Sequence, residues 1–506
     1  MNRNLFDRLS IAVTVGFFLL AHTPISLGQA FEWVKLPAIS GHVNSCSFLD
    51  INQDYLVDIA LTYDKRQAEL FVNAGKGVFH PQIFLTESDL LQSMSWVDYD
   101  NDGDLDLFGI QKKGGFYVYE EFQEASIFER LKSPLANFPT FISNINWGDI
   151  DQDGWLDMFI CRNSPNQTNC FYRYDQNEGF VSFKQLKWLQ DSASLSISSS
   201  WVDWDQDGDE DLFVANKGPN QMYENLGGGL MKKIHSSPIL VDSGNTQAHH
   251  WIDYDNDGDL DLFLANSGQA NQLFCNKGYG KFKLHKKSVL SHASSDTQAS
   301  SWVDIDNDGD LDLLISEKVD AHTHRQKLFM NDGNGQFCLS EKVLPFFNQK
   351  KIRSFIWSDF DLDGLQDLLV VYDSDSMLPI QLYKNTHEQR HWILLKCQGK
   401  SSNRQAIGVK VYIKALIDGK LQWQTRVLQA HTSPSSQGSH LLHFGLGDAQ
   451  SINAMRIEWP SGIIQYFSNV ATNQLYLCEE EESLRVLEVD EEGKILDFSV
   501  RASDHR

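Results

Sequence analysis

The stretch WVDYDNDGDLDLF, from Trp96 to Phe108, places five aspartates between an aromatic residue and an apolar run. Near-identical text recurs as WVDWDQDGDEDLF from Trp201, WIDYDNDGDLDLF from Trp251 and WVDIDNDGDLDLL from Trp302. Carboxylates this close repel one another or take up protons unless a cation neutralises them. The repetition of the block is therefore evidence about the fold, and its clustered carboxylates are evidence about a ligand.

The block repeats with a period of about fifty residues through most of the chain. The first aspartates of the copies are Asp50, Asp98, Asp149, Asp203, Asp253, Asp304 and Asp359. Each copy continues with an apolar run, a third short strand and a Gly-rich turn such as NKGYGKF (276–282). Four short strands in every repeat of this length are typical of a propeller blade. The spacing predicts an all-β protein whose residues 31–390 form a seven-bladed β-propeller.

The first segment of the propeller, FEWVKLP (31–37), is similar to the fourth strand of other copies, such as GKFKLHK (280–286). The seventh copy has its first three strands but no clear fourth. We therefore expect 31–37 to complete the blade that contains Asp359 and Asp367, which leaves no open edge between the first and last blades.

The aspartates follow the pattern D-x-D-x-D-G-x-x-D, which places acids at positions 1, 3, 5 and 9 and a glycine at position 6. Calcium prefers oxygen ligands in such a series, with a sharp turn at the glycine. The predicted ligands are Asp98, Asp100, Asp102 and Asp106; Asp149, Asp151, Asp153 and Asp157; Asp203, Asp205, Asp207 and Asp211; Asp253, Asp255, Asp257 and Asp261; Asp304, Asp306, Asp308 and Asp312; and Asp359, Asp361, Asp363 and Asp367. These loops are not EF-hands, because position 12 is apolar or Gly and the flanks read as strands.

The first copy departs from this pattern. Its ligands would be Asp50, Asn52, Asp54 and Asp58, and Tyr55 stands where the other copies have glycine. A tyrosine is costly if this turn needs a positive φ. We therefore expect six well-formed calcium loops and a weaker first one.

In their blade context the seven loops resemble FG-GAP repeats of the kind found in integrin α-chain propellers, where the loop binds calcium within a β-hairpin. Residues 391–480 are similar to the ASPIC/UnbV domain, chiefly through HFGLG (443–447) and EWPSG (458–462). This order of parts resembles the cartilage acidic protein family. The family motif GAR reads GVK here (Gly408–Lys410), which keeps the charge. The alternating pattern of 391–480 predicts an antiparallel β-sandwich.

The ends of the chain predict its location. Residues 1–30 combine Arg3 and Arg8 with an apolar core (11–21) and a small-residue cleavage site ending at Ala30, as in a signal peptide. We expect a secreted, extracellular protein, or a periplasmic or cell-surface one in a bacterium, with no transmembrane segment after cleavage. The acidic segment 481–506 is expected to form a C-terminal tail.

The cysteines do not form a C-x-x-C motif. In an oxidising compartment, Cys161 is expected to pair with Cys170 and Cys397 with Cys478. The odd total of seven leaves at least one thiol unpaired.

The composition and the missing motifs argue against several classes of function. The formal net charge of -25 argues against nucleic acid as a partner. Serine-hydrolase, zinc-protease and P-loop motifs are absent from the sequence, so no enzyme activity is expected. The favoured function is calcium-dependent extracellular binding or adhesion to a protein or a glycan. A carbohydrate-active enzyme or a lectin that uses the propeller centre is the alternative. The His249–His250 pair and the aromatic residue before each loop are expected to be structural rather than ligand-binding.

Overall fold

A computed structural model describes residues 31–495 except 86–88, 112–114, 122–126, 132–139, 183–193, 242–243, 292–293, 341–343, 345, 347–349, 374–377, 432–435 and 491–493. The expected signal peptide (1–30) and the last residues of the expected tail lie outside this description. Across the described ranges the regular structure is β-strand, apart from two short 3-10 turns, η4 (Pro238–Leu240) and η5 (Val289–Ser291). The fold is therefore all-β, as the sequence predicts.

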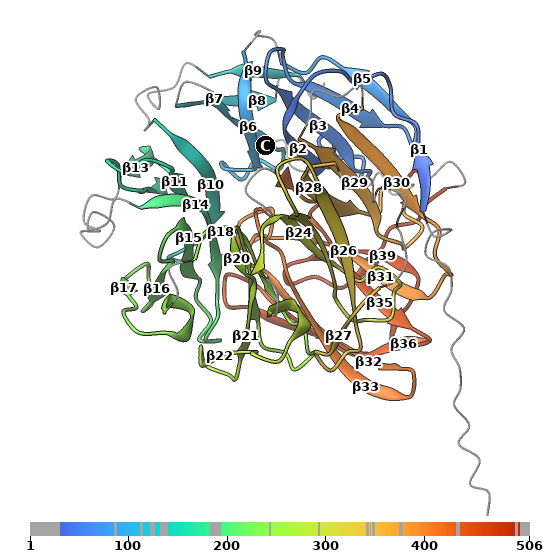
Figure 1. The fold of residues 1–506 in the computed structure, drawn as a ribbon. Helices are drawn as coiled ribbons and strands as arrows, with labels where there is room; N and C mark the ends of the chain where they lie inside the picture. Colours follow the sequence, from blue (N-terminus) through green and yellow to red (C-terminus); the bar gives the residue numbers. More distant parts are fainter. Residues whose placement is uncertain are drawn as a thin grey trace, which may run out of the picture.

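The repeats form four-stranded antiparallel sheets arranged around a common centre (Figure 1). Blade 1 contains β2 (Val43–Leu49), β3 (Asp58–Tyr63), β4 (Glu69–Asn73) and β5 (Phe79–Gln82). Blade 2 contains β6 (Leu91–Val97), β7 (Asp106–Gln111), β8 (Phe116–Glu121) and β9 (Phe128–Arg130). Blade 3 contains β10 (Ile142–Gly148), β11 (Asp157–Arg162), β12 (Cys170–Asp175) and β13 (Gly179–Ser182).

The remaining blades repeat this order. Blade 4 contains β14 (Leu195–Val202), β15 (Asp211–Lys217), β16 (Gln221–Asn225) and β17 (Met231–Lys233). Blade 5 contains β18 (Thr246–Ile252), β19 (Asp261–Asn266), β21 (Gln272–Asn276) and β22 (Phe282–Leu284), with a side ribbon of β20 (Gln269–Ala270) and β23 (Ser294–Ser295). Blade 6 contains β24 (Thr297–Val303), β25 (Asp312–Lys318), β26 (His324–Asn331) and β27 (Phe337–Leu339).

The last blade is closed by the start of the described chain. Its strands β28 (Ile352–Ser358), β29 (Asp367–Tyr372) and β30 (Ile380–Asn385) are joined by β1 (Phe31–Val34), which pairs with β30 in the register Phe31–Asn385. The closure expected from the sequence is thus confirmed, with a strand shorter than 31–37. β2 contacts β28, so the first and last blades are neighbours in the ring.

Aromatic side chains fill the space between blades. Trp147 of blade 3 packs edge-on against Phe108 of blade 2, with ring centroids 4.7 Å apart. Trp251 and Trp302 meet Phe213 and Phe263 of the preceding blades in the same way, as do the corresponding side chains of blade 4. The aromatic residue before each loop is therefore a packing residue, as expected, because its ring is used between sheets rather than offered to a sugar.

The C-terminal domain is a sandwich of two sheets around its own core. One sheet contains β35 (Leu441–Gly447), β31 (His391–Gln398), β39 (Gln474–Glu479) and β40 (Arg485–Val486). The other contains β33 (Lys420–Val427), β32 (Lys410–Ile417), β36 (Ser451–Glu458) and β37 (Ile464–Phe467), with β38 (Val470–Ala471) beside β36. The expectation of an all-antiparallel sandwich is wrong, because β31 and β39 pair in parallel. Strand β40 and the buried Leu487 also extend the ordered fold past residue 480.

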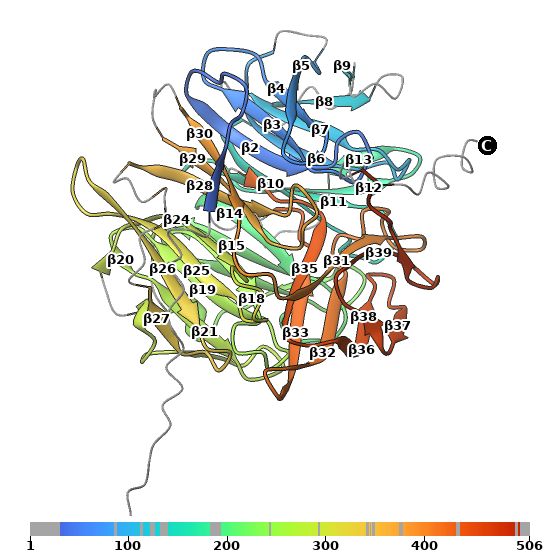
Figure 2. The same ribbon diagram turned by 90° about the vertical axis from the view of Figure 1, so that its right-hand side faces the viewer.

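The two domains are in close contact (Figure 2). Strand β34 (Ser436–Gln437) of the C-terminal segment pairs in parallel with β2, the first strand of blade 1. Gln437 exchanges two hydrogen bonds with the backbone of Trp96 in β6, at 3.0 and 2.8 Å. The Ser436 hydroxyl lies 2.8 Å from that of Ser354 in β28. Residues 436–437 therefore contact the first strands of three blades, at the centre of the propeller.

The cysteines are free thiols in this structure. The expected Cys161–Cys170 bond is wrong. Cys170 pairs with Ile160, so Cys161 is one residue out of register and its side chain points to the opposite face of the sheet. Cys397 and Cys478 are different, since they stand directly opposite each other on β31 and β39 and are both buried in the same core.

We expect Cys397 and Cys478 to form a disulfide when the protein folds in an oxidising compartment, because their register brings the two thiols together. Peptide mass mapping without reduction should give a cross-linked pair of peptides that contain these two residues. Cys161 serves as the internal comparison and should react as a free thiol after unfolding. Recovery of Cys397 and Cys478 as alkylated single peptides from secreted protein would contradict the expectation.

Candidate metal centres

The Asp loops share one backbone conformation. The residue at position 6 has a positive φ in all of them, from 88° at Gly154 to 104° at Gly103 among the glycines. Its N–H donates to the carboxylate of the position 1 aspartate, for example from Gly364 to Asp359 at 2.7 Å. Position 4 also has a positive φ, as at Asn101 with 58°. The turn wraps the loop backbone around its first carboxylate, and the sequence explains this by the glycine at position 6.

The aspartate at position 9 begins the second strand of each blade and is fixed by backbone donors. In blade 5, one oxygen of Asp261 accepts the N–H of Asn276 at 2.6 Å and the other accepts the N–H of Tyr254 at 3.4 Å. Blades 1, 6 and 7 have the same pair of hydrogen bonds. This carboxylate is therefore held toward the loop before any ligand binds.

Several loop carboxylate oxygens are buried without a hydrogen-bond partner. At position 3 these are Asp151 Oδ1, Asp205 Oδ1, Asp255 Oδ1, Asp306 Oδ1 and Asp361 Oδ1. Asp98 Oδ1 and Asp203 Oδ1 at position 1, and Asp157 Oδ2 and Asp211 Oδ2 at position 9, are also unpaired. Buried polar atoms normally have a partner, so this repeated set points to a ligand that the loops supply with oxygens.

The loop carboxylates converge. Ligand atoms of Asp98, Asp100 and Asp106 lie within 4.8 Å of one another, and the same holds for Asp203, Asp205 and Asp211. The loop at Asp253 contains the equivalent group, whereas the group in the loop at Asp149 is formed by positions 1, 3 and 5. Hard oxygen ligands at this spacing suit calcium, which takes six to eight of them.

The electrostatics of the loops favour a divalent cation. Burial, reinforced by neighbouring aspartates, raises the pKa of Asp304 to about 7 and that of Asp308 to about 9. Burial likewise raises the pKa of Asp253 to about 7, although Thr425 and Arg426 of the C-terminal domain oppose the shift. Without a cation these carboxylates cannot all be ionised near neutral pH. A bound Ca²⁺ would remove that conflict.

Loop 1 forms the same turn in spite of its sequence. Tyr55 adopts a φ of 67°, and its N–H donates to Asp50 Oδ2 at 3.0 Å, as the glycines do elsewhere. Asn52 and Asp54 are hydrogen-bonded to each other at 3.0 Å. The tyrosine therefore does not prevent the loop conformation, and weaker calcium binding by loop 1 stays a prediction that rests on Asn52 and on the strained backbone at Tyr55.

Consecutive loops are joined side by side by amide side chains. The position 4 amide of one loop donates to the position 6 carbonyl of the next, as Asn101 does to Gly154 at 2.9 Å and Asn307 to Gly364 at 2.8 Å. A second link comes from asparagines at the end of the third strands, namely Asn73, Asn225, Asn276, Asn331 and Asn385. Each donates to a carbonyl in the loop of the preceding blade, from 2.8 to 3.0 Å. These residues were not predicted, although their recurrence before the Gly-rich turn was a visible signal.

The C-terminal domain covers the face that carries the loops. Arg404 N donates to Asn101 Oδ1 at 2.9 Å, and Gln405 Oε1 accepts the N–H of Asp98 at 2.8 Å. Gly447 N donates to Asn307 O at 2.8 Å, and His443 lies 3.1 Å from the carbonyl oxygen of Gly364. The loops of blades 2, 6 and 7 are thus in direct contact with the second domain.

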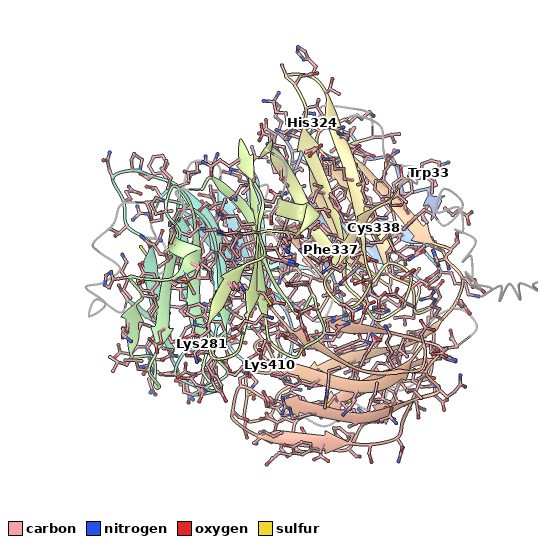
Figure 3. The ribbon with its side chains drawn as sticks, turned by 60° about the horizontal axis from the view of Figure 1, so that its bottom comes forward. Trp33, Lys281, His324, Phe337, Cys338 and Lys410 are labelled. Carbon is pink, nitrogen blue, oxygen red and sulfur yellow. The ribbon has the colours of Figure 1, made fainter. Side chains whose placement is uncertain are left out.

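Lys410, which is labelled in Figure 3, contacts a loop carboxylate directly. From β32 it forms an ion pair with Asp203, the position 1 aspartate of loop 4, and lies 3.6 Å from Glu458. Burial alone would lower the pKa of Lys410, but Asp203 and Glu458 outweigh it and raise the pKa. The basic residue of the GVK motif therefore links the C-terminal domain to the Asp loop of blade 4.

The remaining candidate residues have structural roles. His249 and His250 are hydrogen-bonded in opposite directions, to Ser198 at 3.2 Å and to Ser300 at 2.8 Å, in the two neighbouring blades. Burial lowers the pKa of His249 to about 3 and that of His250 to about 4, so both stay neutral. As expected, the pair does not converge on a metal.

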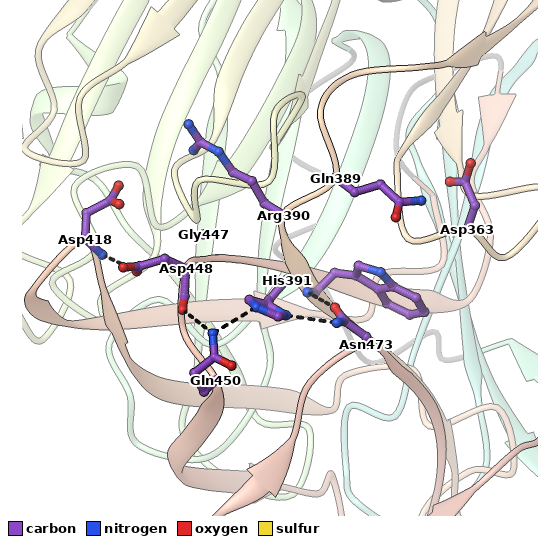
Figure 4. A pocket seen from close by; sticks show the side chains of 10 residues that line it. Asp363, Gln389, Arg390, His391, Asp418, Gly447, Asp448, Gln450 and Asn473 are labelled. Atoms are coloured by element: carbon purple, nitrogen blue, oxygen red, sulfur yellow. Dashed lines mark hydrogen bonds between the residues drawn. The ribbon is translucent and has the colours of Figure 1, made fainter. Parts of the chain in front are cut away.

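A polar pocket of about 650 Å³ lies where the last loop meets the C-terminal domain (Figure 4). Its lining comprises Asp363, Gln389, Arg390, His391, Trp392, Asp418, Gly447, Asp448, Gln450 and Asn473. Gln450 Nε2 bridges His391 and the carbonyl oxygen of Asp448 at 3.1 and 3.0 Å, and Asn473 Nδ2 lies 2.8 Å from the other ring nitrogen of His391. Asp363, a predicted calcium ligand of loop 7, also lines this pocket.

Comparison with known families agrees with this architecture. A model of the FG-GAP-like repeat matches residues 50–109, 149–214, 203–264 and 253–315, and the model named ASPIC and UnbV matches residues 399–485. The chain is an FG-GAP repeat protein with a C-terminal ASPIC/UnbV domain. No curated protein matches this FG-GAP repeat protein significantly. In the part that the structure describes, no helix is long and apolar enough to cross a membrane.

Several solved structures have a similar fold. A lectin of Agrocybe aegerita that recognises non-reducing terminal N-acetylglucosamine is 18% identical over 60% of this chain and 80% of its own, with a TM-score of 0.42. The BP39L lectin of Burkholderia pseudomallei is 12% identical over 68% and 97%, with a TM-score of 0.47. Sqt1 of Saccharomyces cerevisiae is 10% identical over 71% and 100%, with a TM-score of 0.44. Likeness at this level says nothing about what the FG-GAP repeat protein binds.

Proposed function

We propose that this protein is a non-enzymatic extracellular binding protein whose two domains are held together by calcium in the Asp loops. The observation that carries the proposal is the recurrence of buried, unpaired carboxylate oxygens in loop after loop. A cation suits them as a partner, because one ion can bind several carboxylates at once and removes their mutual repulsion. The signal-like sequence of residues 1–30 supports an extracellular location, where free calcium is plentiful.

Calcium in these loops would act on both domains. The loops are joined to one another around the ring. Arg404 and Gln405 of the C-terminal domain contact loop 2, and Lys410 contacts loop 4. Fixing the loop backbones would therefore fix the surface on which the second domain rests. The carboxylates would be committed to the ion, which leaves no acid and base pair for catalysis.

A calcium titration of the full chain tests the proposal. We expect saturable binding of several ions with Kd values of about 10⁻⁴ to 10⁻³ M, as in extracellular calcium modules. Asp253→Ala should remove one ion, whereas Glu129→Ala, at an exposed strand position outside the loops, should leave the count unchanged. Failure of the wild-type chain to bind calcium at millimolar concentration would overturn the proposal.

The side chains that line the interdomain pocket favour a glycan as the ligand. The interdomain pocket is lined by planar polar side chains, namely carboxylates, amides, Arg390 and His391, together with Trp392. Such side chains can pair with neighbouring hydroxyls, and an aromatic ring can cover the apolar face of a sugar. Its acids outnumber its cations, so a neutral glycan fits better than an anionic one. The propeller centre itself, the place expected from the sequence, is entered by residues 436–437 of the C-terminal domain.

A glycan array probed with and without a calcium chelator tests this second candidate. We expect binding of neutral glycans that is lost in Asn473→Ala, because Asn473 holds His391 in place and also accepts the N–H of Trp392 at 3.2 Å. The exposed Tyr279, on a distant turn of blade 5, provides a matched control, and Tyr279→Ala should bind as wild type does. Equal binding by both variants would place any glycan site elsewhere.

A further inference from the structure

One position on the third strand of each blade faces the Asp loop of its own blade. It is the residue directly after the one that pairs with position 10, the residue that follows the last aspartate of the loop motif. We call it the facing position. In blades 1 to 7 it is occupied by Val72, Glu120, Arg173, Glu224, Cys275, Met330 and Lys384. The loops are nearly identical, but this position changes from acid to base to neutral.

Blades 3 and 7 have a cation at the facing position. Arg173 forms an ion pair with Asp151 and lies 3.6 Å from Asp153. Lys384 forms an ion pair with Asp361 and lies 2.8 Å from Asp363. In both loops the cation reaches positions 3 and 5. The Asp151 and Asp361 side chains are about nine-tenths buried, and each keeps an unpaired oxygen.

Blade 2 is the opposite case. Glu120 brings a further carboxylate to its loop, where it accepts a hydrogen bond at 2.7 Å from the hydroxyl of Tyr99, the residue just before Asp100. Blade 4 is mixed, because Glu224 adds an acid while Lys410 of the other domain brings a cation to Asp203.

We propose that the facing position sets the calcium affinity of each loop, so that loops 3 and 7 bind calcium more weakly than loop 6 and loop 2 binds it most tightly. This inference rests on the proposed calcium-binding function. A fixed positive charge about 6 Å from Ca²⁺ costs about tenfold in affinity even at the dielectric constant of water, and more where the site is partly buried. Calcium affinity in proteins follows the number of ligand charges in the same way.

Exchanging the facing residues tests the proposal on the full chain. Lys384→Met and Arg173→Met install the residue that blade 6 already has, and each should increase the affinity of one calcium site by about tenfold or more. Met330→Lys should weaken one site by a similar factor. Lys281→Met, which removes a lysine from a turn of blade 5, is the charge-matched control and should leave every site unchanged. Calorimetric titration, with the number of bound ions measured by elemental analysis, gives both affinity and count.

The outcomes separate this inference from the function on which it rests. If the wild-type chain and all variants bind no calcium, the proposed function fails. If the wild-type chain binds calcium but the three facing-position variants titrate like Lys281→Met, the facing position does not set the affinity and the inference is overturned. A folded state for each variant is checked by circular dichroism before titration. The reciprocal Met330→Lys change keeps the test decisive even if one charge-removing variant folds poorly.

Discussion

Removal of calcium should lower the melting temperature of this protein by about 10 °C or more. At free calcium of ~1 mM and a Kd of ~0.1 mM, each occupied loop contributes about 1.4 kcal/mol if the unfolded chain binds none. Without the weaker loop 1 and the two loops with a cation at the facing position, the four loops of blades 2, 4, 5 and 6 would together contribute roughly 6 kcal/mol. This is comparable to the whole stability of a typical domain, about 5 to 15 kcal/mol.

The net charge points in the same direction. The chain has a formal net charge of -25, and each bound Ca²⁺ removes two negative charges from the folded state. Calorimetry in a chelator, then after readdition of excess calcium, measures the effect and shows whether it is reversible. A chelated sample that melts at the temperature of the calcium-loaded sample would contradict the expectation.

Phe31→Ala should destabilise the propeller by about 3 to 5 kcal/mol, the usual cost of removing a buried phenylalanine. Phe31 belongs to β1, the strand that closes the ring, and is 8% exposed. Its ring centroid lies 6.1 Å from that of Phe346 and 6.3 Å from that of Trp357. The substitution opens a cavity at the seam of the ring and weakens β1, which pairs with β30 on the edge opposite β29.

Trp33→Ala provides the control for this prediction. Trp33 lies two residues further along β1, is 51% exposed and can be located at the edge of the molecule in Figure 3. The substitution removes a larger side chain but leaves the core intact. The free energy of unfolding is therefore expected to fall by less than about 1 kcal/mol. Denaturant unfolding of both variants in saturating calcium gives the comparison. Equal stability losses would mean that the buried contacts of Phe31 do not close the ring.

The features that repeat along the chain could be predicted from the amino-acid sequence. A period of about fifty residues, an aromatic residue before each loop and a turn glycine at position 6 were enough to predict the blades, the ring closure by β1 and the position of every loop carboxylate. The prediction succeeded because the strands of a blade come mostly from one repeat, and the same residue pattern occurs seven times along the chain. Even the deviation at Tyr55 was visible, although the structure shows that its backbone adopts the glycine conformation with a φ of 67°.

Features that depend on strand register or on contact between distant segments could not be predicted and were seen first in the folded chain. Cys161 and Cys170 are close in sequence, but a shift of one residue directs their side chains to opposite faces. The C-terminal domain lies on the loop face through contacts such as Lys410 with Asp203, which are 207 residues apart in the chain. No local pattern specifies such a contact, because it requires two separately folded surfaces to match. The facing position is of the same kind, since it was an unremarkable strand residue until the register of the third strand placed it beside the loop carboxylates.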